Sequence, residues 1–154
     1  MPHIVTHPDG YVISDDPARF DFARAFRWIG TESYWSDGIP EETFRRAVAN
    51  SLAVGVYAPD GAMVAMARIV TDRATFAWLS DVWVDAPHRG AGLGTRLVAY
   101  IRAHPDLQGL RRIHLVTRDA HALYAKFGFA PLDDVERWMG VVDREVYRRS
   151  KPRA

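Results

Sequence analysis

Apolar residues in the centre of the chain follow strand patterns that are separated by turn residues. Residues 52–57, 62–70 and 75–84 are rich in apolar and β-branched side chains, as strands are. Pro59-Asp60-Gly61 separates the first two runs, and Asp72-Arg73 separates the second from the third. Because such short turns join neighbouring antiparallel strands, this region predicts an antiparallel meander.

Helical periodicity appears on both sides of this meander. Apolar side chains recur three or four residues apart in four segments, each with a start or stop signal. The first runs from Asp15-Asp16-Pro17 to Gly30, the second opens at Pro40, the third carries Leu93, Leu97, Val98 and Ile101 and ends at His104-Pro105, and the fourth runs from Asp119 to Gly128.

Three further stretches complete the expected sheet. Residues 11–13 and 113–116 read as short strands, and Phe129 with residues 138–142 supplies late strand material. Helices and strands in this order favour an α+β fold with a mostly antiparallel sheet. A length of 154 residues fits a single domain over residues 1–154, with a core at about residues 11–142.

Composition narrows the class of protein. With 48% hydrophobic residues the chain can bury a core, and a formal net charge of +1 argues against a generally polybasic nucleic-acid binder. The absence of cysteine excludes disulfides and thiolate zinc sites, and the histidine spacing indicates no metal site. No membrane-spanning run or signal-peptide layout is present, so we expect a cytoplasmic protein with no membrane partner.

A glycine-rich turn carries the strongest chemical signal. Gly90, Gly92 and Gly94 follow the strand that ends at Val84 and precede an amphipathic helix. A helix N-terminus presents backbone N–H groups and a positive dipole end, and glycines let a phosphate approach them closely. The spacing differs from the G-x-G-x-x-G dinucleotide fingerprint, and no Gly-Lys-Ser/Thr follows, so neither of those phosphate loops is indicated.

Two motifs in order give a family resemblance. Arg89-Gly90-Ala91-Gly92-Leu93-Gly94 resembles the pyrophosphate motif of the GCN5-related N-acetyltransferase (GNAT) superfamily. Residues 120–129, which include Leu123-Tyr124 and Gly128-Phe129, resemble that family's Ala-x-x-Leu-Tyr-x-x-x-Gly-Phe segment. The resemblance implies splayed middle strands, helices on both faces of the sheet and acetyl-CoA as cosubstrate.

The resemblance also implies roles for particular residues. Tyr124 matches the tyrosine beside the thioester sulfur and is expected to act as the general acid toward the CoA thiolate. Asp81 is the nearest acid in its strand and is expected to orient the amine or to act as a base. The residues expected to bind the cosubstrate are Val82, Trp83, Val84, Arg89, Gly90, Ala91, Gly92, Leu93, Gly94 and Thr95.

The general base is the weakest match to the family pattern. Many relatives carry Glu where this chain has Ser80, and Asn where it has Thr117. Strand alternation places Asp81 on the opposite face from Ser80 and Val82. A wall or orienting role for Asp81 is therefore as consistent with the sequence as a basic one, and water is a further candidate for the base.

The acceptor site is predicted from an aromatic loop and neighbouring strands. The candidate substrate-binding residues are Tyr34, Trp35, Arg68 and Trp78. The competing interpretation makes Trp78 a core residue and pairs Arg68 with a nearby acid. A small-molecule primary amine is the favoured acceptor. A protein lysine or N-terminus, a non-catalytic CoA-binding module and a homodimer all stay open.

Overall fold

In the computed structural model, which describes residues 1–149, six strands form one sheet in the order β1-β2-β3-β4-β5-β6. Every neighbouring pair is antiparallel except β5 and β6, which run parallel. The last five residues of the predicted domain lie outside the described residues. The strands are β1 (Ile4–Thr6), β2 (Val12–Ser14), β3 (Leu52–Tyr57), β4 (Met63–Thr71), β5 (Phe76–Val84) and β6 (Arg112–His114).

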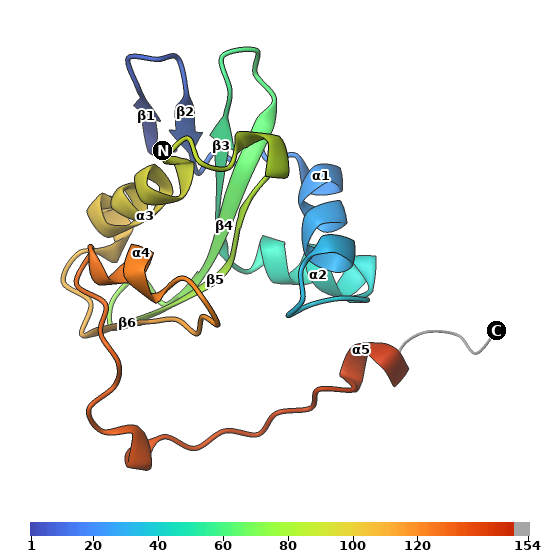
Figure 1. Cartoon of the computed structure of the whole chain (residues 1–154), viewed down its shortest axis with the longest axis vertical. Coiled ribbons are helices and arrows are strands. Elements are labelled where there is room, and N and C mark those ends of the chain that lie inside the picture. The colour runs from blue at the N-terminus through green and yellow to red at the C-terminus, as the bar shows by residue number, and fades with distance from the viewer. Residues whose placement is uncertain (150–154) are drawn as a thin grey trace.

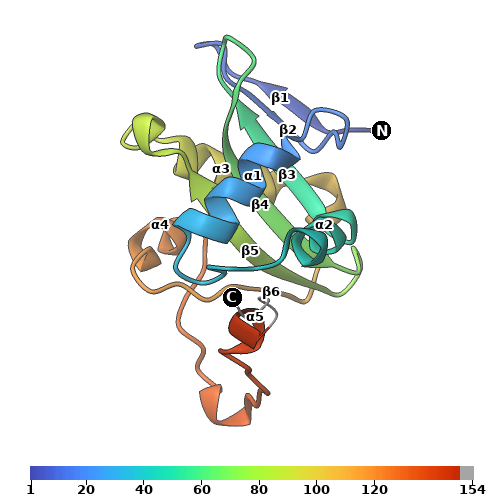
Figure 2. The same ribbon diagram turned by 90° about the vertical axis from the view of Figure 1, so that its right-hand side faces the viewer.

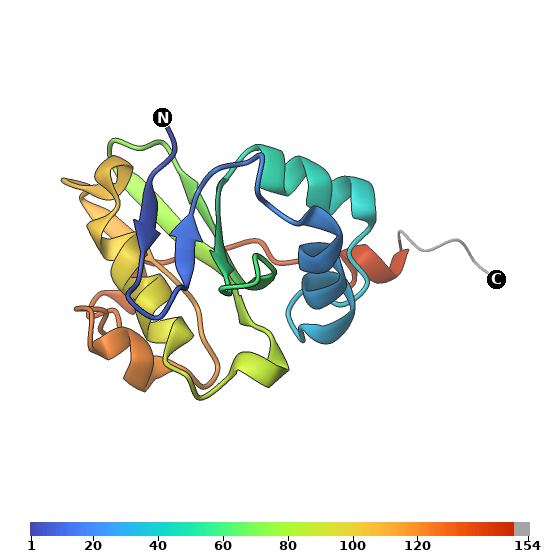
Figure 3. The ribbon, with the colours of Figure 1, turned by 90° about the horizontal axis from the view of Figure 1, so that it is seen from above.

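Helices cover both faces of this sheet, as expected for the α+β fold. Figures 1 and 3 show α3 and α4 on one face and α1 and α2 on the other, and Figure 2 shows α1 and α2 in front of the strands. The helices are α1 (Phe22–Arg27), α2 (Glu41–Ala49), α3 (Leu93–Ala103), α4 (His121–Ala125) and α5 (Val146–Arg149). A π-helix at Trp28–Glu32 extends α1, and short 3-10 turns lie at Ala86–His88, Pro105–Leu107 and Val135–Arg137.

Two apolar clusters hold these helices against the sheet. Leu97, Val98 and Ile101 of α3 are buried in the first cluster. Trp28 and Phe44 are buried in the second, which lies under α1 and α2. Because strand side chains alternate between faces, both faces of the central strands carry apolar residues, as the sequence pattern indicated.

A β-bulge interrupts β5 in the middle of the sheet. Arg68 on β4 faces Ser80, but Met66, two residues earlier, faces Trp83, so β5 contains one extra residue here. Asp81 sits in the bulge with a φ of 50°. The predicted alternation is therefore wrong at this point, because Ser80 and Asp81 both contact Arg68 instead of facing opposite sides.

The pairing of β5 with β6 is short, and the two strands then separate. The parallel register joins Phe76 to Arg112, Ala77 to Ile113 and Trp78 to His114. β5 continues to Val84 without further partners on β6. The expected splay of the middle strands is thus present, and the gap it opens holds the candidate site.

The first helix begins later and ends later than predicted. Asp21, and not the Asp15–Pro17 signal, caps α1, since its side chain accepts a hydrogen bond from the Arg24 N–H at 3.0 Å. Gly30 does not stop the helix. It lies inside the π-helix, where a Cβ would come within 3.1 Å of the Phe26 ring.

The N-terminus adds a strand that the sequence pattern did not predict. β1 pairs with β2, and the backbone N–H of His3 donates to Asp15 Oδ1 at 2.6 Å. Asp15 Oδ2 lies 2.9 Å from Nε2 of His104, a buried residue just after α3. The Tyr100 hydroxyl donates to the His3 carbonyl at 2.7 Å. These contacts join the first residues of the chain to α3.

The prediction of a late strand from Phe129 and residues 138–142 is wrong. Residues 131–149, here called the C-terminal arm, leave the body after α4 and run below it to α5 (Figure 1). Residues 138–142 pair with no strand of the described chain. Met139 is 98% exposed and Val141 is 104% exposed, so these apolar side chains gain no burial from their own chain.

Candidate active site

The glycine-rich turn joins β5 to α3 through a 3-10 turn at Ala86–His88. Gly90 has a φ of 83° and Gly92 a φ of 76°, which side-chain-bearing residues rarely adopt. Gly92 is the N-cap of α3 and makes no side-chain cap hydrogen bond. The N–H groups of the first helical turn therefore have no side-chain acceptor at this cap.

This turn fits a pyrophosphate. A Cβ built on Gly90 or Gly92 would meet no atom within 4 Å, so the space above both residues is open to a ligand. Any side chain there would occupy that space, whereas glycine leaves the helix N-terminus accessible. Leu93 is buried in the core and Gly94 packs beside Leu123, so the loop is anchored on its inner side.

The Arg89 side chain folds back along β5. Its Nε donates to the Val84 carbonyl at 2.9 Å, and its guanidinium lies 4.8 Å from the centre of the Trp83 ring. This arrangement places a positive charge beside the last residues of β5, which are the ones expected to line the pantetheine path. His88, three residues before Ala91, is half-buried at the same turn.

A cavity of about 300 Å³ lies where β5 and β6 separate. Its size is at the lower end of the range for small-molecule sites. The residues that line it come from the aromatic loop, from β5, from the segment after β6 and from α4: Tyr34, Trp35, Trp78, Leu79, Ser80, Asp81, Val82, Leu115, Val116, Thr117, Asp119, Ala120 and Tyr124.

Tyr124 reaches this cavity from α4 and is only 7% exposed. Its ring packs edge-on against Phe129, with 5.7 Å between ring centres. Burial raises the pKa of the Tyr124 hydroxyl to about 12, and the Tyr34 hydroxyl adds a smaller effect in the same direction. The phenol is therefore protonated throughout the neutral pH range and is able to donate a proton or hydrogen bond.

Asp81 is held by two partners at the back of the cavity. Oδ2 accepts from Arg68 Nε at 2.7 Å, and Oδ1 accepts from Trp35 Nε1 at 2.8 Å. The Arg68 guanidinium also donates to Ser51 and Ser80. Asp81 is 7% exposed, so this carboxylate is both paired and shielded from solvent. The predicted substrate residue Arg68 does not line the cavity but supports Asp81 from behind.

The acceptor side of the cavity is aromatic. Trp35 packs edge-on against Tyr34, with ring centres 5.0 Å apart, and against Trp83 at 6.1 Å. The Arg118 guanidinium lies 3.9 Å from the centre of the Tyr34 ring. No sequence pattern pointed to Arg118, because its loop after β6 meets the Tyr34 loop only in the folded chain.

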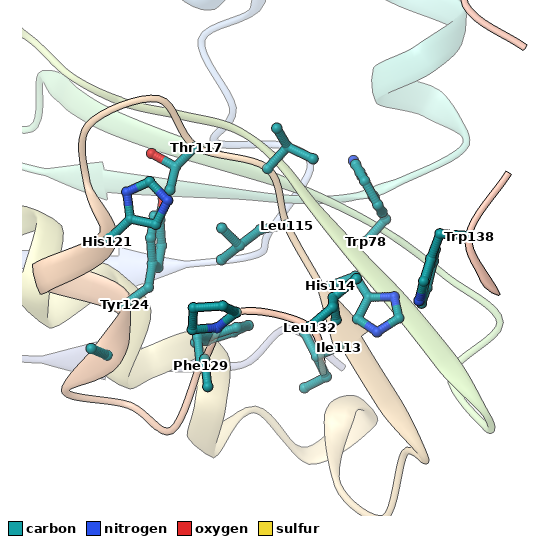
Figure 4. Close-up of a pocket in the computed structure, with 14 residues that line it drawn as sticks. Trp78, Ile113, His114, Leu115, Thr117, His121, Tyr124, Phe129, Leu132 and Trp138 are labelled. Carbon is teal, nitrogen blue, oxygen red and sulfur yellow. The ribbon is translucent and has the colours of Figure 1, made fainter. Parts of the chain in front are cut away.

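A second cavity of about 440 Å³ lies beside β6 and the segment that follows it (Figure 4). Tyr124 and His121 stand at one end of it, and Trp78, His114 and Trp138 stand at the other. Its lining is mostly apolar, with Ile113, Leu115, Phe129, Pro131 and Leu132 among the contributors. Trp78, Leu115, Val116, Thr117 and Tyr124 line both cavities, so the two spaces share a wall.

Residues 1–149 hold no group of three or more histidine, aspartate or glutamate side chains placed to bind a metal ion. None of the helices in that part of the chain has the length and apolar character needed to cross a membrane.

Comparison with known proteins gives a match to a protein family. The sequence model of the Acetyltransferase (GNAT) family matches residues 20–129. A crystal structure of a protein of the GNAT family from Xanthomonas campestris pv. campestris is 39% identical, with a TM-score of 0.85 over 96% of this chain and 98% of that one.

Two further relatives are more distant. Glucosamine 6-phosphate N-acetyltransferase 1 of Oryza sativa subsp. japonica is 28% identical over 71% of this chain and 75% of its own. A Clostridium acetobutylicum protein crystallised with acetyl-CoA shares the fold at 16% identity, with a TM-score of 0.60 over 92% of this chain and 96% of that one.

Proposed function

Because the chain belongs to the acetyltransferase (GNAT) family, we propose that it transfers the acetyl group of acetyl-CoA to the primary amine of a small molecule. The observation that carries this proposal is the position of Tyr124. This residue lines the cavity where β5 and β6 separate, and β5 leads from that cavity to the glycine turn.

Acetyl-CoA would supply an acetyl group activated as a thioester. The glycine turn would bind acetyl-CoA at its pyrophosphate, because the N-terminus of α3 is open there. The part of β5 that does not pair with β6, which includes Val82, Trp83 and Val84, would offer backbone groups on that side to the pantetheine arm. Arg89 lies at the start of the glycine turn and Thr95 in the first turn of α3, so both are candidates to contact the pyrophosphate.

The group transfer balances with the residues present. The amine nitrogen uses its lone pair to form a bond to the acetyl carbon, and the carbon–sulfur bond breaks with its electrons on sulfur. Tyr124 donates its phenolic proton toward that sulfur, and the surplus proton of the amine passes to solvent water, which restores the phenol. The products are an amide and a free thiol.

Water is the proposed proton acceptor because Ser80 and Asp81, the two polar side chains of β5 in the cavity wall, are unsuited. Ser80 is not basic at neutral pH. Both oxygens of Asp81 accept hydrogen bonds from fixed donors, one from Trp35 and one from Arg68, so the carboxylate is already engaged by its own chain. Asp81 instead fixes Trp35, which forms part of the cavity wall.

A small acceptor is favoured by the dimensions and chemistry of the site. The cavity of about 300 Å³ is bounded by the Tyr34–Trp35 loop, and Trp78 and Tyr124 add two more aromatic side chains to its walls. A flat or partly apolar amine would bury its surface there, whereas a protein substrate needs an open groove along the surface. The two tyrosine hydroxyls and Thr117 supply polar groups for orientation.

A screen of small amines with acetyl-CoA, read as release of free thiol, tests this function. We expect steady thiol release with at least one compact, partly aromatic amine and none without an acceptor. Peptide lysines and peptide N-termini serve as competing acceptors in the same assay. Turnover with peptides and with no small amine would overturn the small-molecule proposal, and binding of CoA without any turnover would overturn the enzymatic one.

A further inference from the structure

We propose that a third cavity, at the opposite end of α3 from the glycine turn, binds a phosphate group. The group would be carried by inorganic phosphate or by a small phosphate monoester. The cavity has a volume of about 330 Å³. Three parts of the chain enclose it, namely the end of α3 with the turn that follows, the turn into β6, and residues 127–129 after α4.

This cavity is separate from the proposed cosubstrate site. Gly92 caps the start of α3, and Arg102 lies in the last turn of the same helix, ten residues later. At a rise of 1.5 Å per residue, these two positions are about 15 Å apart along the helix axis. None of the residues assigned above to acetyl-CoA lines the cavity. A molecule bound there would therefore be a second ligand.

The charged side chains of the cavity are both cationic. Arg102 and Arg111 line it, and no aspartate or glutamate of residues 1–149 does. Neither guanidinium forms an ion pair or a hydrogen bond within that part of the chain. Asp106, the acid nearest in sequence, is paired with Arg73 at 3.5 Å. Two unpaired guanidinium groups in one cavity favour a doubly charged anion, and guanidinium binds phosphate oxygens through paired N–H donors.

The turn into β6 adds backbone donors. Gly109 and Leu110 line the cavity, and their backbone N–H groups donate to no acceptor within the described chain. Gly109 has a φ of 72°, and a Cβ built on it would meet no atom within 4 Å. The backbone of this turn is therefore open to a ligand. Successive free N–H groups in a turn form concavities that bind anions.

The end of α3 is capped in a way that suits an anion. Free carbonyls at a helix C-terminus repel negative charge. Gln108 Nε2 donates to the carbonyl of Arg102 and to that of His104, at 2.9 Å in each case. These two acceptors are thereby occupied. The cavity thus combines two guanidinium groups and two free N–H groups with a helix end whose exposed negative charge is reduced.

The shape of the cavity decides between possible anions. A phosphate presents oxygens in several directions, so it would accept from both guanidinium groups and from the turn at the same time. A volume of about 330 Å³ leaves room beside the phosphate for a small organic group. Leu107 and Phe127 supply apolar surface for such a group. Inorganic phosphate would leave this part of the cavity to water.

The site is linked to Tyr124, and this part of the proposal rests on the proposed function. The Tyr124 carbonyl accepts from the N–H of Phe127 at 2.9 Å and from that of Phe129 at 3.3 Å. Both phenylalanines line the cavity, and Figure 4 shows Phe129 beside Tyr124. The Arg102 guanidinium lies 6.0 Å from the centre of the Phe129 ring. A bound phosphate would restrain this loop and so alter the position of Tyr124.

Titration of the isotope-labelled chain with inorganic phosphate, followed by amide NMR, tests the site. We expect saturable shifts of the Gly109 and Leu110 N–H signals, with no such shifts in sodium chloride of equal ionic strength. A parallel titration with glycerol phosphate separates the two sources. Tighter binding than that of inorganic phosphate indicates a monoester, and weaker binding indicates the free ion.

Saturating CoA distinguishes this site from the glycine turn. Since CoA would occupy the glycine turn, the phosphate response of Gly109 and Leu110 should persist in its presence. Loss of that response when CoA is bound would assign the phosphate to the cosubstrate site and overturn the proposal. Shifts that do not saturate, or that chloride reproduces, would also overturn it.

Arg111→Gln removes one guanidinium whose side chain forms no ion pair or hydrogen bond within residues 1–149, so the fold should stay intact. We expect the dissociation constant for phosphate to rise about 10-fold or more, because a charge-assisted hydrogen bond is lost. The matched control is Arg46→Gln, which removes the same charge from an exposed arginine of α2 on the other face of the sheet (Figure 1). Equal constants in the two variants would overturn the proposal.

Thiol release at saturating acetyl-CoA tests the link to Tyr124. We expect phosphate to change the maximal rate about 2-fold or more in the wild type and in Arg46→Gln, and to have no effect in Arg111→Gln. Phosphate that binds without changing the rate would support the site and overturn its link to Tyr124. Phosphate binding by a chain that releases no thiol with any amine would support the site while overturning the proposed function.

Discussion

Arg68 and Asp81 form an ion pair across β4 and β5, with Nε and Oδ2 2.7 Å apart. Their side chains are 16% and 4% exposed, so the pair is largely removed from solvent. The bulge in β5 brings Asp81 to the same side as Ser80 and within reach of the guanidinium. The pair thereby ties the irregular part of β5 to its neighbouring strand.

Asp81→Asn should destabilise the fold and slow turnover while leaving acetyl-CoA binding nearly unchanged. Loss of one partner leaves the buried Arg68 charge uncompensated, which costs about 3 kcal/mol of unfolding free energy. Trp35 loses its charged acceptor, so the cavity wall loosens on the acceptor side. Urea unfolding measures the first effect, and thiol release with calorimetric CoA titration measures the others.

A double-mutant cycle with Arg68→Met is the control for this ion pair. Removing both charges should cost less than the sum of the single losses, by at least about 1 kcal/mol. Strict additivity of the two losses would show that the pair is not coupled. Full activity in a folded Asp81→Asn enzyme would remove Asp81 from the acceptor mechanism.

Gly92→Val should weaken CoA binding about 10-fold or more without unfolding the domain. The substitution places a branched side chain in the open space above the α3 N-terminus, where the phosphates would approach backbone N–H groups. Each lost charge-assisted hydrogen bond is worth about 1.5–3 kcal/mol. Calorimetry with CoA gives the affinity, and thermal melting gives the stability.

Gly109→Val is the matched control for backbone strain. Gly109 has a φ of 72°, close to the 76° of Gly92, and a Cβ at either residue would have open space around it. It lies in the turn before β6, away from the glycine turn. Both variants should lose similar stability, and only Gly92→Val should lose affinity. Equal affinities for CoA would disprove the pyrophosphate assignment.

Tyr124→Phe should lower turnover about 10²–10⁴-fold with little change in acetyl-CoA binding, because it removes the donor and keeps the ring. The ring contact with Phe129 is preserved, so stability should change little. An acyl donor with a more acidic leaving thiol should partly restore the rate. Since burial raises the pKa of Tyr124 to about 12, wild-type turnover should show no alkaline decline with a midpoint near 10.

A normal rate for Tyr124→Phe at saturating acceptor would leave the hydroxyl with a packing role only. Tyr34→Phe provides a comparison, since it removes the other phenol of the cavity from an exposed position. We expect that variant to change the acceptor KM more than the maximal rate.

Stability should fall as the pH rises from about 10 to 12. Burial raises the pKa of both Tyr57 and Tyr124 to about 12, whereas an unfolded tyrosine titrates near 10. Burial raises the pKa of Tyr100 in the same direction. Below pH 10 both states are protonated and the stabilisation is complete. Above pH 10 the tyrosines of the unfolded chain ionise first. The contribution of each of these residues to the free energy of unfolding therefore falls by on the order of 2 kcal/mol by pH 12.

Urea midpoints between pH 8 and pH 11 check this dependence. Tyr57→Phe removes one of these buried phenols and should flatten the decline above pH 10. Tyr34→Phe, at an exposed tyrosine, should leave the slope unchanged. A wild-type midpoint that is constant to pH 11 would contradict the expected titration.

Sequence patterns predict those elements that are determined by residues close together in the chain. The meander, α3 and the glycine turn follow from hydrophobic period and turn residues, and the structure has all three. The start of α1 differs from its prediction because two acidic signals lie six residues apart, at Asp15 and Asp21. The Asp15 carboxylate instead contacts the His3 backbone N–H and the His104 ring. These contacts are long-range in the folded chain, and no local sequence pattern predicts them.

The candidate site was predictable where it depends on a motif and unpredictable where it depends on an irregularity. Gly92 lies at the N-cap of α3 and Tyr124 in the wall of the cavity between β5 and β6, while the binding and catalytic roles that the motifs imply for them stay predictions. No glycine marks the bulge at Asp81 in the sequence, so simple alternation placed Asp81 on the wrong side of the sheet. Residues 138–142 have a strand pattern without a strand partner in the described chain, because pairing depends on what lies beside them.

The link between Asp15 and His104 has a consequence for the order of events during synthesis. The two residues are 89 positions apart in the chain, so the ribosome releases the first well before the second is made. At about 5–20 residues per second the delay is on the order of 4–18 s. The contact between the N-terminal strands and the end of α3 therefore forms only after His104 has been synthesised. The edge of the sheet that is made first is thus fixed in place late.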